Sequence, residues 1–251
     1  MTRHAIDVEA VHGSSWWRFL AGFAVVVAVL MTTSSVDATG RLGLAILAAV
    51  FAAALVVERT LYARSARSAV RLLGFGRPPI TPLVTATLVA GLIQLVYPIL
   101  TAITGAVPQL RPGWPWLLVG VFAFHGLAEE LVWRGYAYRR LRVGRGFWPA
   151  VLWTMPLVAA THVPIVVTSG PAVGLAAMVV AAVTALPLAW LFDAGRGTLW
   201  APAVVHAGID SFKLVEVPAP ALTTFSLLLA GVSLVVPLAV LAVPRRFLEA
   251  R

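Results

Sequence analysis

Long runs of apolar residues, separated by short polar or basic segments, extend along almost the whole chain. About 20 consecutive apolar residues cross a bilayer as a helix, and the pattern predicts about eight such segments. In chain order they cover residues 16–33, 42–57, 82–103, 116–138, 147–167, 172–192, 199–214 and 222–243. The seventh is short, and Pro218 and Pro220 follow its end. The sequence therefore predicts an all-α polytopic membrane protein.

Basic residues are distributed unevenly between the two sides of this arrangement. Residues 58–79 form an Arg-rich linker whose spacing favours a short amphipathic helix on the membrane surface. With the N-terminus inside, the arginines of this linker, of residues 139–145 and of the C-terminal tail all fall inside. Only Arg41, Arg111 and Lys213 then lie outside. Because Lys and Arg collect in cytoplasmic loops, we expect both termini to be cytoplasmic, with residues 1–15 a tail rather than a signal peptide.

Composition supports the membrane assignment and excludes several classes of chemistry. Hydrophobic residues make up 60% of the chain and charged residues only 12%, whereas a soluble domain is about a quarter charged. The net charge of +9 follows from the cytoplasmic loops, so no nucleic-acid partner is expected. Without cysteine, the chain can form neither a disulfide nor a thiolate metal site. The preference for Arg over Lys, with abundant Ala and Val, is typical of bacteria with GC-rich genomes, and we expect a multi-pass protein of a bacterial plasma membrane.

Ionisable residues occur in only three of the predicted spans. They are His125, Glu129, Glu130 and Arg134 on the fourth, His162 on the fifth, and His206 and Asp210 on the seventh. A charged side chain at the centre of a membrane helix costs at least about 2.5–3.5 kcal/mol, so such groups need partners or a function. A single buried His is often a structural polar group. For a set on three helices, convergence on one site in the cytoplasmic half of the membrane is the better explanation, although His162 fits that depth less well.

Spacing separates the two adjacent carboxylates. Glu130 and Arg134 are four residues apart and can form an ion pair on one helix face. Glu129 lies about 100° around the helix and shares its face with His125. His206 and Asp210 are also four residues apart. A carboxylate that activates water, together with His groups that orient it or donate a proton, is typical of hydrolysis. The same groups also suit a divalent metal.

The ordered motifs resemble the CPBP family of intramembrane proteases, also called the CAAX protease or ABI family, which includes the Ras-converting CAAX prenyl endopeptidases. The similarity rests on Glu129-Glu130-x-x-x-Arg134, on His162, and on His206-x-x-x-Asp210. It implies that Glu129 activates the attacking water and that Glu130 is tied to Arg134. It also implies that His162 assists Glu129, and that His206 and Asp210 stabilise the oxyanion.

Two positions depart from the family pattern. Val158 stands where Phe usually precedes the second-motif histidine, and Asp210 stands where Asn is usual. An ionised Asp cannot donate a hydrogen bond to an oxyanion. Asp210 therefore is protonated, orients His206, or helps to hold a metal. A zinc-like metal on Glu129, His162 and His206 and metal-free water activation remain equal alternatives, and His125 lies outside the family motif.

The leading hypothesis is an endopeptidase that hydrolyses a peptide bond of a membrane-anchored protein or peptide. The alternatives are a proton- or ion-coupled transporter and a non-catalytic immunity or scaffold protein of the same family. The expected organisation has three parts. Residues 1–113 form a tail and three spans, residues 114–214 form the protease core, and residues 215–251 form the last span and a basic tail.

Overall fold

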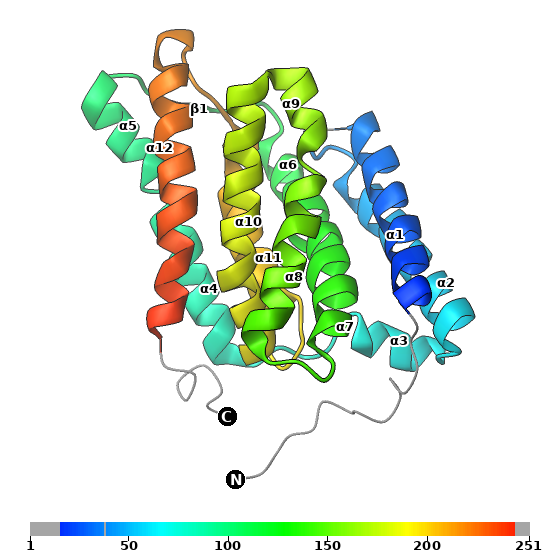
Figure 1. Cartoon of the computed structure of the whole chain (residues 1–251). Helices are drawn as coiled ribbons and strands as arrows, with labels where there is room; N and C mark the ends of the chain where they lie inside the picture. The colour runs from blue at the N-terminus through cyan, green and yellow to red at the C-terminus, as the bar shows by residue number, and fades with distance from the viewer. Residues whose placement is uncertain (1–15, 38, 244–251) are drawn as a thin grey trace.

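The computed structural model is almost entirely helical, which confirms the predicted fold class (Figure 1). It describes residues 16–37 and 39–243, so the predicted N-terminal tail and the C-terminal Arg245, Arg246 and Arg251 lie outside the described residues. The elements in order are α1 (Trp16–Val36), α2 (Gly43–Tyr62), α3 (Ala66–Leu72), α4 (Ile80–Ile93), α5 (Val96–Thr104), β1 (Gln109–Leu110), α6 (Trp114–Val121), η1 (Phe122–Ala128), η2 (Leu131–Tyr138), α7 (Arg139–Arg142), α8 (Phe147–Ala160), α9 (Val163–Ser169), α10 (Pro171–Ala194), α11 (Trp200–Ile209), η3 (Asp210–Leu214), β2 (Val215–Glu216), η4 (Ala219–Ala221), α12 (Leu222–Val235) and η5 (Val236–Ala242).

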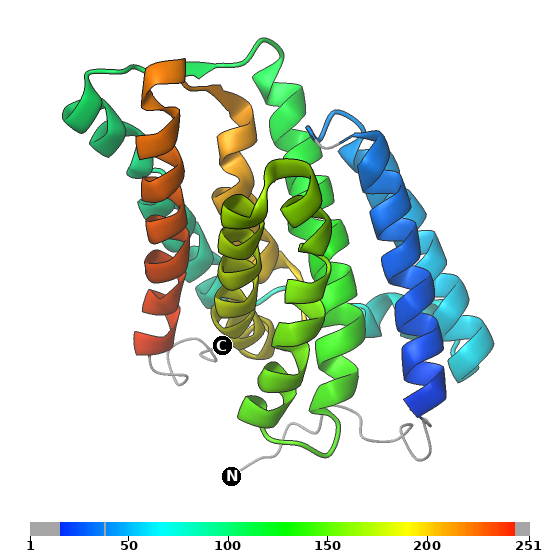
Figure 2. The ribbon, with the colours of Figure 1, turned by 45° about the horizontal axis from the view of Figure 1, so that its top comes forward.

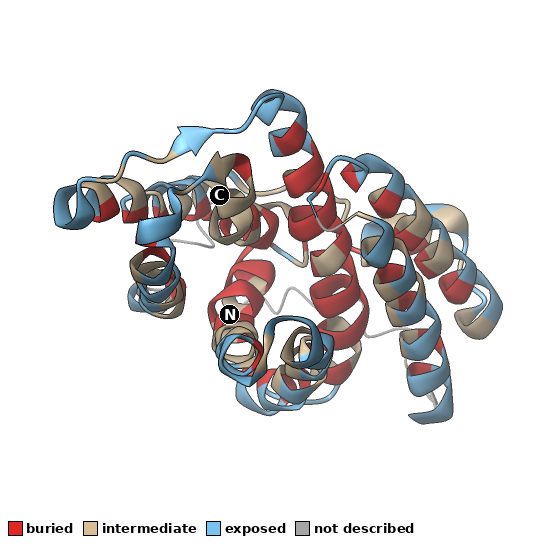
Figure 3. Cartoon of the chain, turned by 90° about the horizontal axis from the view of Figure 1, so that it is seen from above, coloured by how far each residue is buried: buried red, intermediate tan, exposed pale blue. Residues whose placement is uncertain are grey.

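Seven helical segments of the described chain are long and apolar enough to cross a membrane. One of them, Trp114–Arg142, is formed by α6, η1, η2 and α7 and is called the central helix below. In its most apolar stretch 72% of the residues are buried, against 22–39% in the other six. Figure 3, viewed along the bundle, shows buried residues gathered on the inner helices and exposed residues on the outer ones. The outer helices therefore present their apolar side chains to lipid, and the central helix is enclosed by protein.

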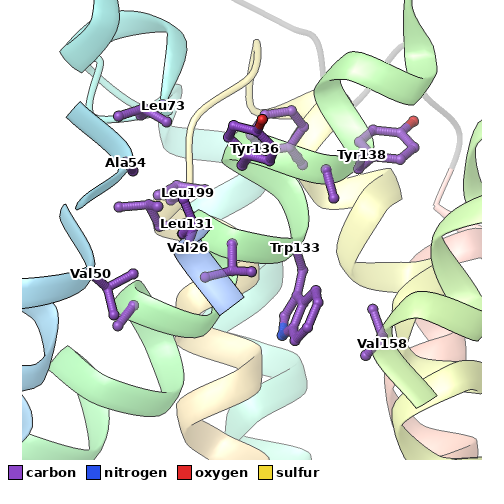
Figure 4. Packing of buried hydrophobic residues seen from close by; sticks show 14 of the residues in the cluster. Val26, Val50, Ala54, Leu73, Leu131, Trp133, Tyr136, Tyr138, Val158 and Leu199 are labelled. Atoms are coloured by element: carbon purple, nitrogen blue, oxygen red, sulfur yellow. The ribbon is translucent and has the colours of Figure 1, made fainter. Parts of the chain in front are cut away.

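The central helix lies between two groups of helices. The α1–α2 hairpin packs on one side of it, and α12 lies beyond α10 and α11 on the other side (Figure 2). Trp133 and Tyr136 of the central helix are buried in a hydrophobic cluster with Val26 of α1, Val50 of α2 and Leu199 beside α11 (Figure 4). These contacts fix the central helix from several directions, which a chain needs if it is to hold charged groups at membrane depth.

Two predicted spans are interrupted. The third divides into α4 and α5 at Gln94, whose side chain donates to the carbonyls of Ala90 and Gly208. The fifth divides into α8 and α9 at Thr161 and His162. A break inside a membrane protein is tolerated when other groups satisfy the freed backbone and side-chain atoms. Gln94 does so by bonding across to the helix α11 that carries His206.

The predicted seventh span, residues 199–214, is helical but too short to cross a membrane. It consists of α11 and the 3₁₀ segment η3, and at 1.5 Å per residue the ten residues of α11 extend only about 15 Å. Beyond η3, β2 pairs antiparallel with β1 at the opposite end of the bundle. The chain therefore passes from one end of the bundle to the other through α11 and η3, although α11 is shorter than a full transmembrane helix. As a result, α1 begins and η5 ends at the same end of the molecule (Figure 1).

That end, called the basic end below, also holds α3 and α7 with most of the described arginines. The predicted surface helix is present as α3. Sequence analysis placed Glu58 in the polar linker, whereas the structure buries it completely at the end of α2. Its Oε1 atom accepts hydrogen bonds from Arg139 at 2.8 Å and Arg140 at 2.7 Å. The Arg140 guanidinium also stacks on Tyr136. These bonds join the α1–α2 hairpin to the central helix.

Replacing Glu58 with Ala should therefore destabilise the protein strongly. The change leaves two largely buried guanidinium groups without their counter-ion, and breaking a buried ion pair costs about 3–5 kcal/mol. Thermal unfolding in detergent measures the effect. The matched control is Glu216→Ala, which removes an exposed ion pair with Arg111 and should change stability by less than about 1 kcal/mol. Equal melting temperatures for the two variants would contradict the role assigned to Glu58.

Candidate functional site

The backbone of the central helix widens on both sides of the two adjacent carboxylates. The amide of Glu129 donates to the carbonyl of Phe124, and that of Arg139 donates to the carbonyl of Arg134, each five residues back. These are π-helical turns, which are rare and are often found at functional sites. Glu129 and Glu130 lie between the two π-helical segments, η1 and η2.

Glu130 is the buried member of the pair. Its side chain is 0% exposed, and its Oε1 atom accepts a hydrogen bond from Arg134 Nη1 at 2.7 Å. The predicted ion pair between residues four apart is therefore present. The same oxygen lies 2.6 Å from Nδ1 of His206 on α11. Glu130 thus connects the central helix to α11, a contact that sequence spacing did not predict.

Glu129 occupies a different environment. Its side chain is 15% exposed, so it keeps some access to the surroundings of the protein. Its Oε1 atom lies 2.7 Å from His125 Nδ1, and its Oε2 atom lies 3.5 Å from His206 Nε2. The first is a short hydrogen bond, and the second is at the outer limit for one. One oxygen is therefore held firmly, and the other retains room for a further partner.

His206 contacts three carboxyl groups. Nδ1 faces Glu130, while Nε2 lies 3.5 Å from Oε2 of Glu129 and 3.5 Å from Oδ2 of Asp210. A neutral imidazole carries only one N–H, so both nitrogens can donate only in the imidazolium form. Glu129 and Glu130 on the central helix and Asp210 at the start of η3 surround this ring with carboxylates. Their negative charges favour positive charge on the imidazole. Asp210 lies where it can orient His206, as its spacing predicted.

His162 lies at the break between α8 and α9. Its Nδ1 atom is 3.0 Å from the carbonyl of Val158 and 3.5 Å from Oγ1 of Thr161. Among the described residues, its hydrogen bonds stay within this turn, and it does not join the hydrogen-bonded cluster of Glu129, Glu130 and His206. Its assistance to Glu129 therefore stays a prediction.

Small residues bring α11 against the central helix. A Cβ atom added to Gly126 would lie 2.9 Å from the carbonyl oxygen of Ala203, three residues before His206. On the other face of α11, a Cβ atom on Gly208 would lie 2.9 Å from Cβ of Ala90 on α4. Small residues permit this close approach of membrane helices. Here they place α11 so that His206 reaches Glu130.

The donor set does not fit the predicted metal site. The part of the chain that the structure describes contains no group of three or more His, Asp or Glu side chains arranged to hold a metal ion. Both nitrogens of His206 already face carboxylates, and His162 bonds to its own turn. Metal dependence stays a prediction, and no step below is assigned to a metal.

His125 lies beside Glu129 on the central helix, as its spacing of four residues predicted. Because it lies outside the resembled motif, the sequence did not assign it a role in the site. In the structure it is buried, and its Nδ1 atom lies 2.7 Å from Oε1 of Glu129.

A protein-family model matches the middle part of the chain. The family model described as "Type II CAAX prenyl endopeptidase Rce1-like" matches residues 111–212. This region includes the whole central cluster from His125 to Asp210, together with the break at His162. No curated protein and no solved structure gave a significant match.

The close approach at Gly126 yields a test of the packing that builds the site. Gly126→Ala should destabilise the protein by about 1–3 kcal/mol, because the new methyl group would contact a backbone oxygen that can move only with α11. Gly231→Ala in α12 is the matched control, because nothing lies within 4 Å of the added Cβ atom. There the loss of glycine from a helix interior should be neutral or stabilising. Thermal unfolding in detergent compares the two variants, and equal stability would contradict the proposed contact.

Proposed function

We propose that this chain, whose residues 111–212 match the Rce1-like family model of type II CAAX prenyl endopeptidases, is an intramembrane protease in which Glu129 activates the water that cleaves the substrate. The observation that carries this proposal is the difference between the two adjacent carboxylates. Glu130 is fully buried and bonded through Oε1 to Arg134 and His206, whereas Glu129 is partly exposed and its Oε2 atom faces His206 across 3.5 Å. This difference supports Glu129, rather than Glu130, as the group that accepts a proton from water.

In the first step, Oε2 of Glu129 removes a proton from water while the water oxygen attacks the scissile carbonyl carbon. The carbonyl oxygen becomes an oxyanion, and the N–H of His206 stabilises it. In the second step the C–N bond breaks, the carbonyl reforms, and the proton held by Glu129 passes to the leaving amine. General-base catalysis typically contributes about 10²–10⁴-fold, and one oxyanion donor about 10²–10³-fold.

The other groups support these two. Arg134 neutralises Glu130, and Glu130 in turn holds His206 through Nδ1. Asp210 orients the opposite ring nitrogen, so an ionised carboxylate can serve there without donating to the oxyanion. His162 approaches from the α8–α9 break and assists Glu129 once substrate is bound. In this arrangement no metal is required to make the nucleophile.

The substrate is a membrane-anchored protein or peptide whose scissile bond reaches the site from the basic end. Positive loops lie on the cytoplasmic side of membrane proteins, so we place the basic end in the cytoplasm of a bacterial cell. A lipidated tail that lies in the bilayer would present its polar segment at this level.

Replacement of Glu129 by Gln should abolish peptide cleavage, with a loss of at least about 10²–10⁴-fold, because the amide cannot accept the proton of the attacking water. The assay uses purified protein and an internally quenched peptide ending in a farnesylated CAAX sequence, with the same peptide without lipid in parallel. Glu216→Gln at the opposite end is the control and should retain full activity. Full activity of the Glu129 variant would refute the mechanism, and proton flux in liposomes without cleavage would favour a transporter.

Asp210→Asn should keep activity within about tenfold of the wild type, because the amide oxygen is still an acceptor that can face Nε2 of His206. Asp210→Leu has a similar size but no acceptor, and should lose at least an order of magnitude more. The same cleavage assay compares both variants. If both variants lost the same amount of cleavage activity, the charge of Asp210 would be what matters. Orientation of His206 would then not be the role of Asp210.

A further inference from the structure

We propose that His125 is a positioning residue for Glu129: it holds one carboxylate oxygen so that the other faces the substrate water. The proposal rests on the proposed function of Glu129 and extends it to a residue outside the resembled motif. It is carried by a hydrogen bond, by the burial of the His125 ring, and by the different surroundings of the two Glu129 oxygens.

The hydrogen bond is short and enclosed. His125 Nδ1 lies 2.7 Å from Glu129 Oε1, and the two side chains are 8% and 15% exposed. The ring lies against the neighbouring Phe124, with ring centroids 3.9 Å apart. A bond shielded from water in this way is stronger than the same bond on a surface. It therefore limits the rotation of the carboxylate.

The second ring nitrogen identifies the tautomer. Nε2 of His125 is buried and has no hydrogen-bond partner among the described residues. A buried N–H without a partner costs about 1–3 kcal/mol. The arrangement is therefore most consistent with a neutral ring that carries its proton on Nδ1 and donates it to Glu129. In that state Oε1 is occupied, and proton transfer is left to Oε2.

The geometry of Oε2 completes the argument. It lies 3.5 Å from His206 Nε2, too far for a strong bond but close enough for one water molecule beside the two atoms to contact both. Rotation of the carboxylate would exchange the two oxygens and remove this alignment. A misplacement of about 1 Å can cost about 10²-fold in rate. His125 thus acts on the reaction through Glu129 without touching the substrate.

A purely structural role predicts a different response to mutation. His125→Leu keeps a similar volume but removes the hydrogen-bond donor of Glu129 Oε1, so it should destabilise the fold by about 1–3 kcal/mol. A purely structural role would show only in this loss of stability. Under our proposal, kcat of the folded variant should also fall about 10- to 100-fold, with KM unchanged.

Rescue by a conservative variant separates the two roles further. In His125→Asn the amide nitrogen occupies the position of Nδ1 and can donate to Oε1 of Glu129. This variant should recover most of the kcat that His125→Leu loses. Both are assayed with the farnesylated CAAX peptide described above. If His125→Leu keeps the wild-type kcat, or if Asn and Leu lose the same amount of kcat, the proposal is wrong.

A measurement that does not depend on activity decides the question even if no peptide is cleaved. In ¹⁵N-histidine-labelled wild-type protein, the His125 signals are assigned by their absence in His125→Asn. We expect Nδ1 to be protonated, Nε2 unprotonated, and the Nδ1 signal to shift in Glu129→Ala. An unprotonated Nδ1, or signals that Glu129→Ala leaves unchanged, would overturn the proposal. Even then, the proposed function would be supported if the wild type cleaves the peptide and Glu129→Gln does not.

Discussion

The central constraint on this molecule is the cost of holding two adjacent carboxylates at membrane depth. Water cannot solvate them there, so each must find donors within the protein. Glu130 is held through its Oε1 atom by Arg134 on its own helix and by His206 from α11. Glu129 is held through its Oε1 atom by His125. The remaining architecture serves to bring these donors to the central helix and to keep lipid away from it.

That requirement explains why the polar helix is enclosed and the others are not. The outer helices satisfy their backbone internally and expose apolar side chains, which costs nothing in lipid. The central helix has π-helical turns on both sides of the carboxylates, and its neighbours must approach closely for hydrogen bonds to form. Gly126 and Gly208 permit that approach on the two faces of α11. At the basic end, Glu58 with Arg139 and Arg140 joins the first hairpin to the same helix.

Interactions within one helix were predictable from the sequence, and interactions between helices were only partly so. Hydropathy located the spans, and a spacing of four residues identified the pair of Glu130 and Arg134. The same rule placed His125 beside Glu129. It could not show that His206 would bond to Glu130, because that depends on the rotation and depth of α11 relative to the central helix. The burial of Glu58 was missed for the same reason, since its partners follow it by about eighty residues in the chain.

Two identical side chains, adjacent in sequence, thus acquire different chemistry from their surroundings. Separate environments for paired carboxylates are a recurrent way to divide catalytic and supporting roles. A cation and an imidazole on Glu130 hold it in place and remove its freedom to exchange protons with solvent. Glu129 has His125 Nδ1 at 2.7 Å from one oxygen and a distance of 3.5 Å to His206 Nε2 from the other. Since a base must be both fixed in position and accessible, the partly exposed Glu129 is the one suited to act on water. The fully buried Glu130 is suited to position His206 opposite it.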